Sequence, residues 1–246
     1  MKGFNRHNYI QQLSIDCVIF GYQEKQLKVL VPKLAFKGDF WTLPGGYIRQ
    51  DEGIDDAAKR ILEERTGIQD IYLEQYQVFG EVSRTSEQLL AELSVLNENK
   101  FSEMQLQGET LEWLSKRFIS IGYYALVDIK KVVPKLMEID SSIDWYPIEE
   151  LPTMIMDHKL QVQAALKTLR HRLDEKLIGF NLLPEKFTMK ELQQLYEAVY
   201  DRSFRRNNFQ KKMLDLNVLE RLEKKFTGAA HKAPYLYRFK YSTKEY

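Results

Sequence analysis

Residues 45–68, GGYIRQDEGIDDAAKRILEERTGI, decide the fold of this chain. Their pattern predicts a strand, a loop and a helix. Asp55 and Asp56 fall in the first helical turn, where the helix dipole favours negative charge. Gly53 stands at the expected N-cap, and Gly67 stands where a residue of left-handed conformation would end the helix.

The spacing within this stretch resembles the box of the Nudix hydrolases. That box reads G, five residues, E, seven residues and then R-E-U-x-E-E-x-G-U, where U is aliphatic. The positions that match are Gly46, Glu52, Arg60, Leu62, Glu64, Gly67 and Ile68. An ordinary amphipathic helix would not explain the matches that lie before the helix. Glu63 is a further carboxylate outside the pattern, and we expect it in solvent because it points about 100° away from Glu64.

Two positions of the box depart from the pattern, since Ile61 and Arg65 replace expected glutamates. They are four residues apart and share the helix face that would bind Mg²⁺ or Mn²⁺ in an active enzyme. Mg²⁺ prefers oxygen ligands, and a guanidinium repels it and cannot be deprotonated. We therefore expect no catalytic residues, no cofactor and poor binding of Mg²⁺. The alternative is an active hydrolase of ADP-ribose or of a nucleotide sugar.

Composition places the chain among globular proteins of one large or two modest domains, because 246 residues with 44% hydrophobic content support a substantial core. Cys17 is the single cysteine, which excludes an internal disulfide and fits a reducing compartment. The sequence shows no N-terminal signal pattern and no apolar run of about 18 residues. We expect a cytoplasmic protein with no membrane partner.

Charge is distributed unevenly along the chain. Residues 183–246 contain 14 Lys and Arg against 8 Asp and Glu, a net charge of +6. The remaining residues contain 22 basic and 27 acidic side chains, a net charge of −5. A basic C-terminal part on a mildly acidic body is typical of nucleic-acid binding.

Apolar and β-branched runs around the box predict the other elements of the first part. The predicted strands are residues 13–22, 27–34, 71–79, 118–128 and 144–147, and a helix is predicted for residues 159–176. Residues 84–117 predict an inserted helical hairpin whose two helical pieces are separated by a polar stretch. The hairpin could act as a lid, a dimer contact or a surface feature.

Several polar and aromatic residues near these strands are candidate ligand contacts. Asp16, in an apolar strand, is either a satisfied carboxylate or a ligand contact. Lys33 either faces an anionic or hydroxylated ligand or is solvated, and Trp41 and Tyr47 either pack in the core or stack on a base or sugar. The candidate ligand-binding residues are Asp16, Lys33, Trp41, Gly46, Tyr47 and Glu64. We expect His158 to cap or pack rather than to catalyse.

The C-terminal part predicts two helices joined by a tight turn. Residues 188–191, TMKE, form a capping box ahead of apolar residues at helical spacing. A turn at 201–203 follows, with Ser203 as the N-cap of a second helix that reaches about Leu216. Phe209, Met213 and Leu216 form its predicted inner stripe. Residues 219–225 and 235–241 then read as two strands around a basic loop.

This arrangement predicts a winged helix-turn-helix whose second helix reads DNA. Asn and Gln can bond adenine edges, and Arg and Lys can bond guanine edges or phosphates. The candidate DNA-binding residues are Arg205, Arg206, Asn207, Asn208, Gln210, Lys211, Lys212, Lys224, Lys225 and Lys232. A solvated, lysine-rich surface helix is the alternative.

The two parts together resemble the Nudix-related transcriptional regulators, in which a Nudix-like effector domain precedes a winged helix-turn-helix. GFNLLPEKFTMKELQQLYEAVY and RNNFQKKM carry the C-terminal resemblance, and DDAAKRILEERTGI is most similar to the sugar-responsive branch, exemplified by an arabinose-responsive repressor. The resemblance implies an α+β protein with a Nudix-like α/β/α sandwich and mixed sheet in residues 1–178 and a winged helix-turn-helix in 179–246.

Function follows from the same resemblance as an expectation. The chain would be a homodimeric regulator that binds double-stranded operator DNA and senses a pentose, a sugar phosphate or an ADP-ribose-like molecule. A protein-interaction adaptor built on an inert Nudix fold is a further alternative.

Overall fold

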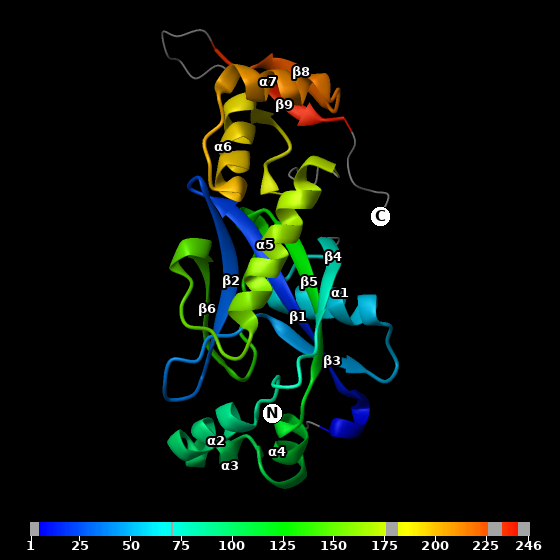
Figure 1. The fold of residues 1–246 in the computed structure, drawn as a ribbon, viewed down its shortest axis with the longest axis vertical. Helices are drawn as coiled ribbons and strands as arrows, with labels where there is room; N and C mark the ends of the chain where they lie inside the picture. Colours follow the sequence, from blue (N-terminus) through cyan, green and yellow to red (C-terminus); the bar gives the residue numbers. More distant parts are fainter. Residues whose placement is uncertain (1–4, 70, 176–181, 226–232, 241–246) are drawn as a thin grey trace.

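The computed structural model describes residues 5–69, 71–175, 182–225 and 233–240, and it has the predicted α+β architecture (Figure 1). A mixed sheet forms the first part, with helices on both faces. A smaller helical part with its own short sheet stands on one end of the first sheet. None of the described helices is both long enough and apolar enough to span a bilayer.

The first sheet is organised around strand β1. Its strand order is β4–β5–β1–β2–β6, and β3 also pairs with β1. The strands are β1 (Tyr9–Gln23), β2 (Gln26–Leu34), β3 (Gly45–Arg49), β4 (Tyr72–Phe79), β5 (Ile119–Val127) and β6 (Asp140–Pro147). β1 runs parallel to β5 and antiparallel to β2 and β3. Thus every predicted strand is present, and the sheet is mixed as predicted.

Two strands are longer than predicted. β1 begins four residues early because Tyr9 pairs with Arg49 of β3, beyond an irregularity in the ladder. β6 begins at Asp140 because its first residues pair with the end of β2. In both cases pairing with a neighbouring strand extends a segment whose own sequence is polar.

The two faces of β1 bury different helices, as the alternation of side chains along a strand requires. Ile15, Cys17 and Ile19 share a core with Ala57 and Ile61 of helix α1 (Ile54–Thr66). The intervening residues face helix α5 (His158–Glu175) in a second core. Short 3₁₀ helices cover Arg6–Asn8, Ile129–Lys131 and Ile148–Glu150.

The predicted ends of α1 are confirmed. Gly53 is its N-cap, and Gly67 follows its last turn with a φ of 71°. Glycine adopts this left-handed conformation at low cost, which suits it to end the helix.

The insertion consists of three helices rather than the predicted hairpin. These are α2 (Glu87–Leu96), α3 (Glu98–Glu103) and α4 (Gly108–Ser115). The prediction was wrong because the stretch between α2 and α4 is polar only on average. Its Phe101, Met104 and Leu106 are buried together with Leu93, and Phe36 and Phe40 pack against them. The insertion therefore packs on its own sheet domain.

The C-terminal part is a winged helix, as predicted. Its elements are β7 (Phe187–Thr188), α6 (Met189–Tyr200), α7 (Arg206–Asp215), β8 (Leu219–Lys224) and β9 (Tyr235–Phe239), and the strand order is β7–β9–β8. The capping box is present: Thr188 accepts from the Glu191 N–H at 3.2 Å, and the Glu191 carboxylate accepts from the Thr188 N–H at 2.6 Å.

Two details of this module differ from the prediction. Arg205, not Ser203, is the N-cap of α7. The chain cannot enter the helix earlier because the Phe204 N–H donates to the Glu197 carboxylate at 2.9 Å, which keeps the turn extended. Leu216 lies beyond the last helical residue and is 40% exposed, so it does not belong to the inner stripe.

The two parts of the molecule share one hydrophobic core. A single cluster of buried side chains includes Val162 and Leu169 of α5 as well as Leu192 and Val199 of α6. Two hydrogen bonds between α5 and the end of α6 reinforce this contact. Burial raises the pKa of Tyr22, in the β1–β2 hairpin, to about 12, with a further contribution from acidic residues of α6.

Removing a buried side chain from the insertion tests whether it is part of the cooperative fold. Phe101 is 3% exposed, so Phe101→Ala is expected to lower the unfolding free energy by about 3 kcal/mol. Val95 in α2 is 83% exposed, and Val95→Ala is expected to change it by less than about 0.5 kcal/mol. Urea unfolding followed by tryptophan fluorescence measures both. Equal stability of the two variants would contradict the packing of α3.

Candidate functional site

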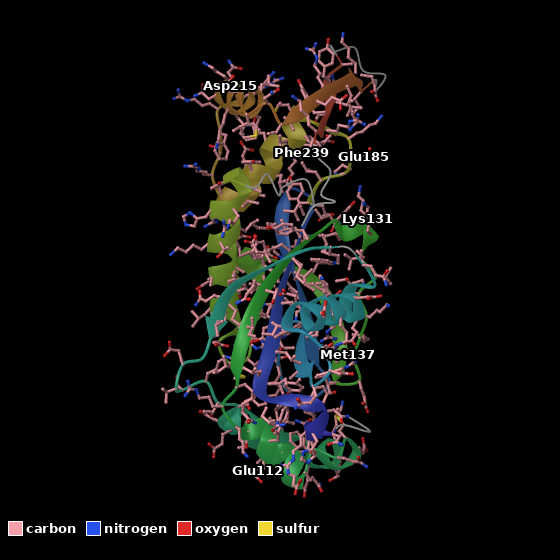
Figure 2. The ribbon with its side chains drawn as sticks, turned by 90° about the vertical axis from the view of Figure 1, so that its right-hand side faces the viewer. Glu112, Lys131, Met137, Glu185, Asp215 and Phe239 are labelled. Atoms are coloured by element: carbon pink, nitrogen blue, oxygen red, sulfur yellow. The ribbon has the colours of Figure 1, made fainter. Side chains whose placement is uncertain are left out.

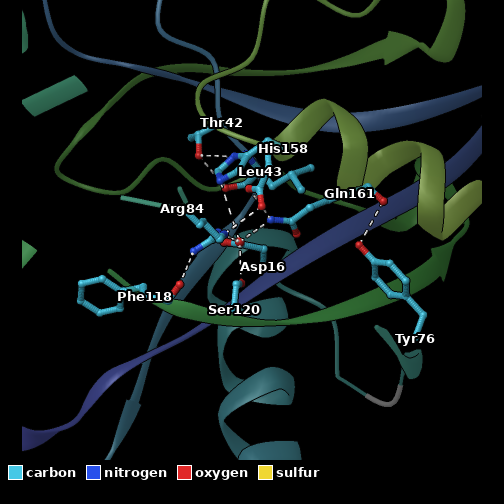
Figure 3. A network of polar contacts seen from close by, with 10 residues as sticks. Asp16, Thr42, Leu43, Tyr76, Arg84, Phe118, Ser120, His158 and Gln161 are labelled. Atoms are coloured by element: carbon cyan, nitrogen blue, oxygen red, sulfur yellow. Dashed lines mark hydrogen bonds and ion pairs between the residues drawn. The ribbon is translucent and has the colours of Figure 1, made fainter. Parts of the chain in front are cut away.

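A buried polar network surrounds Asp16 on β1 (Figure 3). Its Oδ2 accepts from Arg84 Nη2 at 2.9 Å and from Ser120 Oγ at 2.6 Å. Gln161 Nε2, from α5, donates to the same oxygen at 2.9 Å. Arg84 also donates from Nε to Asp157 at 2.9 Å. Asp16 is thus a satisfied carboxylate that ties β1, β5, α5 and the chain after β4 together.

His158 joins this network as a neutral ring. Its Nδ1 accepts from the Leu43 N–H at 2.9 Å, so this nitrogen carries no proton. Its Nε2 lies 3.8 Å from Asp16 Oδ2. Burial lowers the pKa of His158, and the Arg84 charge lowers it further, while Asp16 and Asp157 oppose the change. His158 is therefore buried and holds the Leu43 backbone in place, which agrees with the expectation that it packs.

The Asp16 carboxylate is held in its charged form. Burial alone would raise the pKa of Asp16, but the charge of the Arg84 guanidinium acts in the opposite direction. The hydrogen bonds from Ser120 and Gln161 act in the same direction, so the pKa of Asp16 lies below its ordinary value.

A cleft lies beside this network, between the end of β4 and the start of α5. Its volume is about 510 Å³, which suits a small metabolite. We name it the β4–α5 cleft, and it is lined by Gln77, Val78, Phe79, Gly80, Glu81, Ser83, Arg84, Thr85, Met156, Asp157, Leu160 and Ala164. Carboxylates and hydroxyls in this lining can bond hydroxyl groups, and the exposed Val78 and Leu160 offer apolar surface.

The six predicted ligand residues are not brought into one pocket. None of the six lines the β4–α5 cleft. Lys33 pairs with Asp39 at 2.8 Å, with its Nζ 5.3 Å from the centre of the Trp41 ring.

Tyr47 lies among aromatic rings, with centroids 4.8 Å from Trp113 and 5.5 Å from Phe118. Gly46 and Glu64 lie towards α1, across the sheet from the cleft. An added Cβ at Gly46 would approach the Ile61 side chain to 3.0 Å.

Arg84 and Gln161 are the residues that sequence reasoning missed. Arg84 was interpreted as the first residue of the insertion, although it is buried and touches both the cleft and Asp16. An arginine in the loop that follows the strand ending at Phe79, a loop that also holds Ser83 and Thr85, was the available signal.

The box residues occupy two separate environments. Ile61 is part of the core beneath α1, and Arg65 is buried in an ion pair with Asp140 of β6. The expectation that Arg65 presents its charge to a metal-binding face is therefore wrong, because its guanidinium is turned inward and neutralised. Glu63 is exposed, as expected.

Arg60 holds the remaining carboxylates of the box. Its Nη2 donates to Glu52 at 2.6 Å, and its Nη1 donates to Glu64 at 3.3 Å. The hydrogen bond from Arg60 lowers the pKa of Glu52 against the opposing effect of burial. The Arg60 side chain also donates to the Tyr47 carbonyl at 2.9 Å, which ties α1 to β3.

Helix α7 presents the predicted base-reading side chains to solvent. Asn207, Asn208 and Lys211 are exposed, whereas Phe209 and Met213 are buried against α6 and the wing sheet. Arg205, Arg206 and Lys212 are exposed as well, and Gln210 is half-buried. Figure 2 shows Asp215, the last residue of α7, at the opposite end of the molecule from Glu112 in the insertion.

The wing consists of β8, β9 and the loop between them, and the described residues include both strands. Lys224 Nζ lies 5.5 Å from the centre of the Tyr235 ring. Lys225 pairs with Glu191 at 3.1 Å, so it contacts the start of α6, which the sequence did not indicate. Lys232 lies outside the described residues.

Comparison with known families identifies the first part of the chain. A model of the NUDIX domain matches residues 11–166. The chain belongs to the Nudix family. A second model, the NrtR DNA-binding winged helix domain, matches residues 179–239.

Similar proteins share this two-part arrangement. The ADPR responsive transcriptional repressor NtrR of Acinetobacter baylyi is 24% identical over 92% of this chain and 81% of its own. The crystal structure of Shewanella oneidensis NrtR has a TM-score of 0.68 and 25% identity, and covers 94% of each chain. The same protein in complex with a 27mer DNA has a TM-score of 0.67, with 24% identity and 94% of each chain covered.

Two positions of the Nudix box carry side chains that offer no oxygen ligand to a divalent metal. The two substituted positions are occupied by the core residue Ile61 and by the Arg65–Asp140 ion pair. Within the described part of the chain, no three His, Cys, Asp or Glu side chains are grouped so that they could hold a metal ion.

The neutral state of His158 predicts a pH dependence of stability. In the unfolded chain the ring takes up a proton below about pH 6.5, whereas the buried ring resists it. The unfolding free energy is therefore expected to fall as the pH drops below this value. His158→Gln, whose amide oxygen can accept from Leu43, should flatten this slope, and the exposed His7→Gln should not. Urea unfolding between about pH 7 and about pH 5 measures it. An unchanged slope in His158→Gln would contradict a neutral buried ring.

Proposed function

We propose that this chain is a transcriptional regulator whose winged helix binds operator DNA under the control of a small effector bound by the Nudix domain. The observation that carries the proposal is α7, which presents Asn207, Asn208 and Lys211 to solvent from a core that includes α5 of the Nudix domain. The match to a DNA-binding winged helix model and the repressor named above support it.

The side chains of α7 divide into two roles. Asn207 and Asn208 can read base edges, since an amide can donate and accept at adenine. Arg205, Arg206 and the lysines of α7 and of the wing supply charge for phosphate contacts. The +6 net charge of residues 183–246 supports the same division.

ADP-ribose is the effector that we propose for the Nudix domain. The repressor from Acinetobacter, which aligns with nearly the whole chain, is described as ADPR responsive, so we prefer this molecule to a pentose or a sugar phosphate. We place its adenosine half in the β4–α5 cleft, where Glu81 and Asp157 can accept from ribose hydroxyls. Val78 and Leu160 supply apolar surface for the base.

We further propose that the domain binds this ligand without hydrolysing it. Hydrolysis by Nudix enzymes depends on carboxylates that hold a divalent metal, and Ile61 and Arg65 replace two of them. Arg65 cannot replace a metal-binding carboxylate, because its side chain is a guanidinium and is buried in an ion pair with Asp140. The regulator would act in the cytoplasm, where its operator is accessible.

We also propose that the chain forms a homodimer. One recognition helix reads a short half-site, and a two-fold dimer matches a palindromic operator with half-sites about one helical turn apart. The Nudix domains would form the main contact between the two copies. An effector that alters this contact would alter the spacing of the two α7 helices.

Substitution of Asn207 tests specific recognition. Asn207→Ala is expected to cost roughly 1–3 kcal/mol on an operator selected from random duplexes, and little on unselected DNA. Lys224→Ala should instead weaken both and flatten the salt dependence. Asn99→Ala, an exposed change in the distant α3, is the control. Fluorescence anisotropy titrations measure the affinities, and equal binding of all sequences by wild type and Asn207→Ala would reject base reading by this helix.

Effector control has a separate test. ADP-ribose is expected to weaken operator binding by about tenfold or more, within the usual range of allosteric coupling. Ser83→Trp, which fills the β4–α5 cleft, should abolish the response, while Val95→Trp in α2 should respond like wild type. A Ser83→Trp protein that responds fully would exclude this cleft as the binding site.

The same samples also test whether the protein hydrolyses ADP-ribose. With millimolar Mg²⁺ present, chromatography is expected to recover ADP-ribose unchanged. Metal-dependent turnover that Glu64→Gln abolishes would instead establish the hydrolase alternative.

A further inference from the structure

A second cleft lies at the junction of the two domains, apart from the β4–α5 cleft. Its volume is about 400 Å³, and it is lined by Gln163, Lys167, Arg170 and His171 of α5 and by Tyr200 at the end of α6. We name it the α5–α6 cleft. Because its walls come from the Nudix domain and from the DNA-binding module, a ligand in it would contact both.

The lining of this cleft is basic. Lys167, Arg170 and His171 fall within four residues of one another on α5, so their side chains lie on adjacent turns of one helix face. No Asp or Glu side chain is among the lining residues. Lys167 and His171 are exposed, and neither is ion-paired within the described part of the chain. The two permanently charged side chains, Lys167 and Arg170, are three residues apart on the helix, so they repel each other when no anion is present.

Arg170 is held in position for an anion. Its Nε donates to the Val199 carbonyl at 2.7 Å, near the C-terminal end of α6. The Tyr200 hydroxyl donates back to the Arg170 carbonyl at 2.8 Å. This exchange fixes the guanidinium, and its two terminal nitrogens have no hydrogen-bond partner within the described residues. A guanidinium oriented in this way can bind two phosphate oxygens at once.

Tyr200 provides a rigid wall opposite the basic residues. Its ring stacks on Tyr196 at an interplanar angle of 26° and a centroid distance of 6.1 Å. Tyr196 belongs to the core that both domains share. The cleft is therefore preorganised by packing on the α6 side and by hydrogen bonds on the α5 side.

We propose that the α5–α6 cleft binds a small anion that carries a phosphate or diphosphate group, and that this anion holds the Nudix domain and the winged helix in one relative orientation. Figure 1 places α7 beyond α6 from α5, at the far end of the molecule. A duplex that lies along α7 therefore does not require this cleft, so we assign the cleft to a small molecule and not to the DNA backbone.

Inorganic pyrophosphate is the probe that tests the site. Calorimetric titration of the full chain at low ionic strength should give saturable binding. Lys167→Gln/His171→Gln removes one exposed charge and one exposed imidazole donor from the cleft, and it is expected to weaken binding by about tenfold or more, as loss of charge-assisted bonds does. Lys130→Gln/Lys131→Gln, two exposed lysines on the other side of the sheet domain, should bind like wild type.

Three results would overturn the proposal. One is the absence of saturable binding to the wild-type chain. Another is equal affinity of wild type and Lys167→Gln/His171→Gln. The third is a loss of operator affinity in this variant without pyrophosphate, together with a shallower salt dependence, which would assign the cleft to DNA phosphates.

Discussion

The carboxylate of Asp16 is the point on which the Nudix domain depends. It is buried, and donors from the chain after β4, from β5 and from α5 converge on it. A buried charge is stable only when it is paired and hydrogen-bonded, so each of these elements is constrained to the position that satisfies Asp16. Arg84, which bonds Asp16, also lines the β4–α5 cleft, so the position of Asp16 fixes one wall of the cleft. Gln161 is a residue of α5, so its bond to Asp16 fixes the position of that helix.

Local sequence patterns predicted those parts of the fold that depend on neighbours along the chain. The ends of α1 follow from Gly53 and Gly67, and the start of α6 follows from Thr188 and Glu191. Burial of Phe101 could not be read from its polar surroundings, because its packing partners, such as Phe36, lie more than sixty residues away. The start of α7 was misplaced for a related reason, since the Glu197 carboxylate, not Ser203, controls the turn.

In the candidate site, too, features set by neighbours along the chain were predictable and features set by distant residues were not. The exposed residues of α7 were predictable because their exposure follows from helical periodicity against Phe209 and Met213. The surroundings of the predicted ligand residues in the Nudix domain were not predictable. The alternation along a strand assigns Asp16 to one face of the sheet, but it does not reveal which side chains from other elements pack on that face. Arg65 is the clearest example: its sequence position indicated a charge beside a metal site, and only the fold supplies Asp140 as its buried partner.

Helix α5 is one continuous element of 18 residues that packs both on the sheet of the Nudix domain and on α6. At the helical rise it is about 27 Å long, so a tilt of about 5° around its first turn displaces its far end by about 2 Å. Hydrogen bonds to base edges do not survive a shift of that size. In the proposed regulator α5 would therefore act as a lever: a tilt too small to disturb the sheet would be large enough at the far end of the helix to move α7 out of a DNA groove.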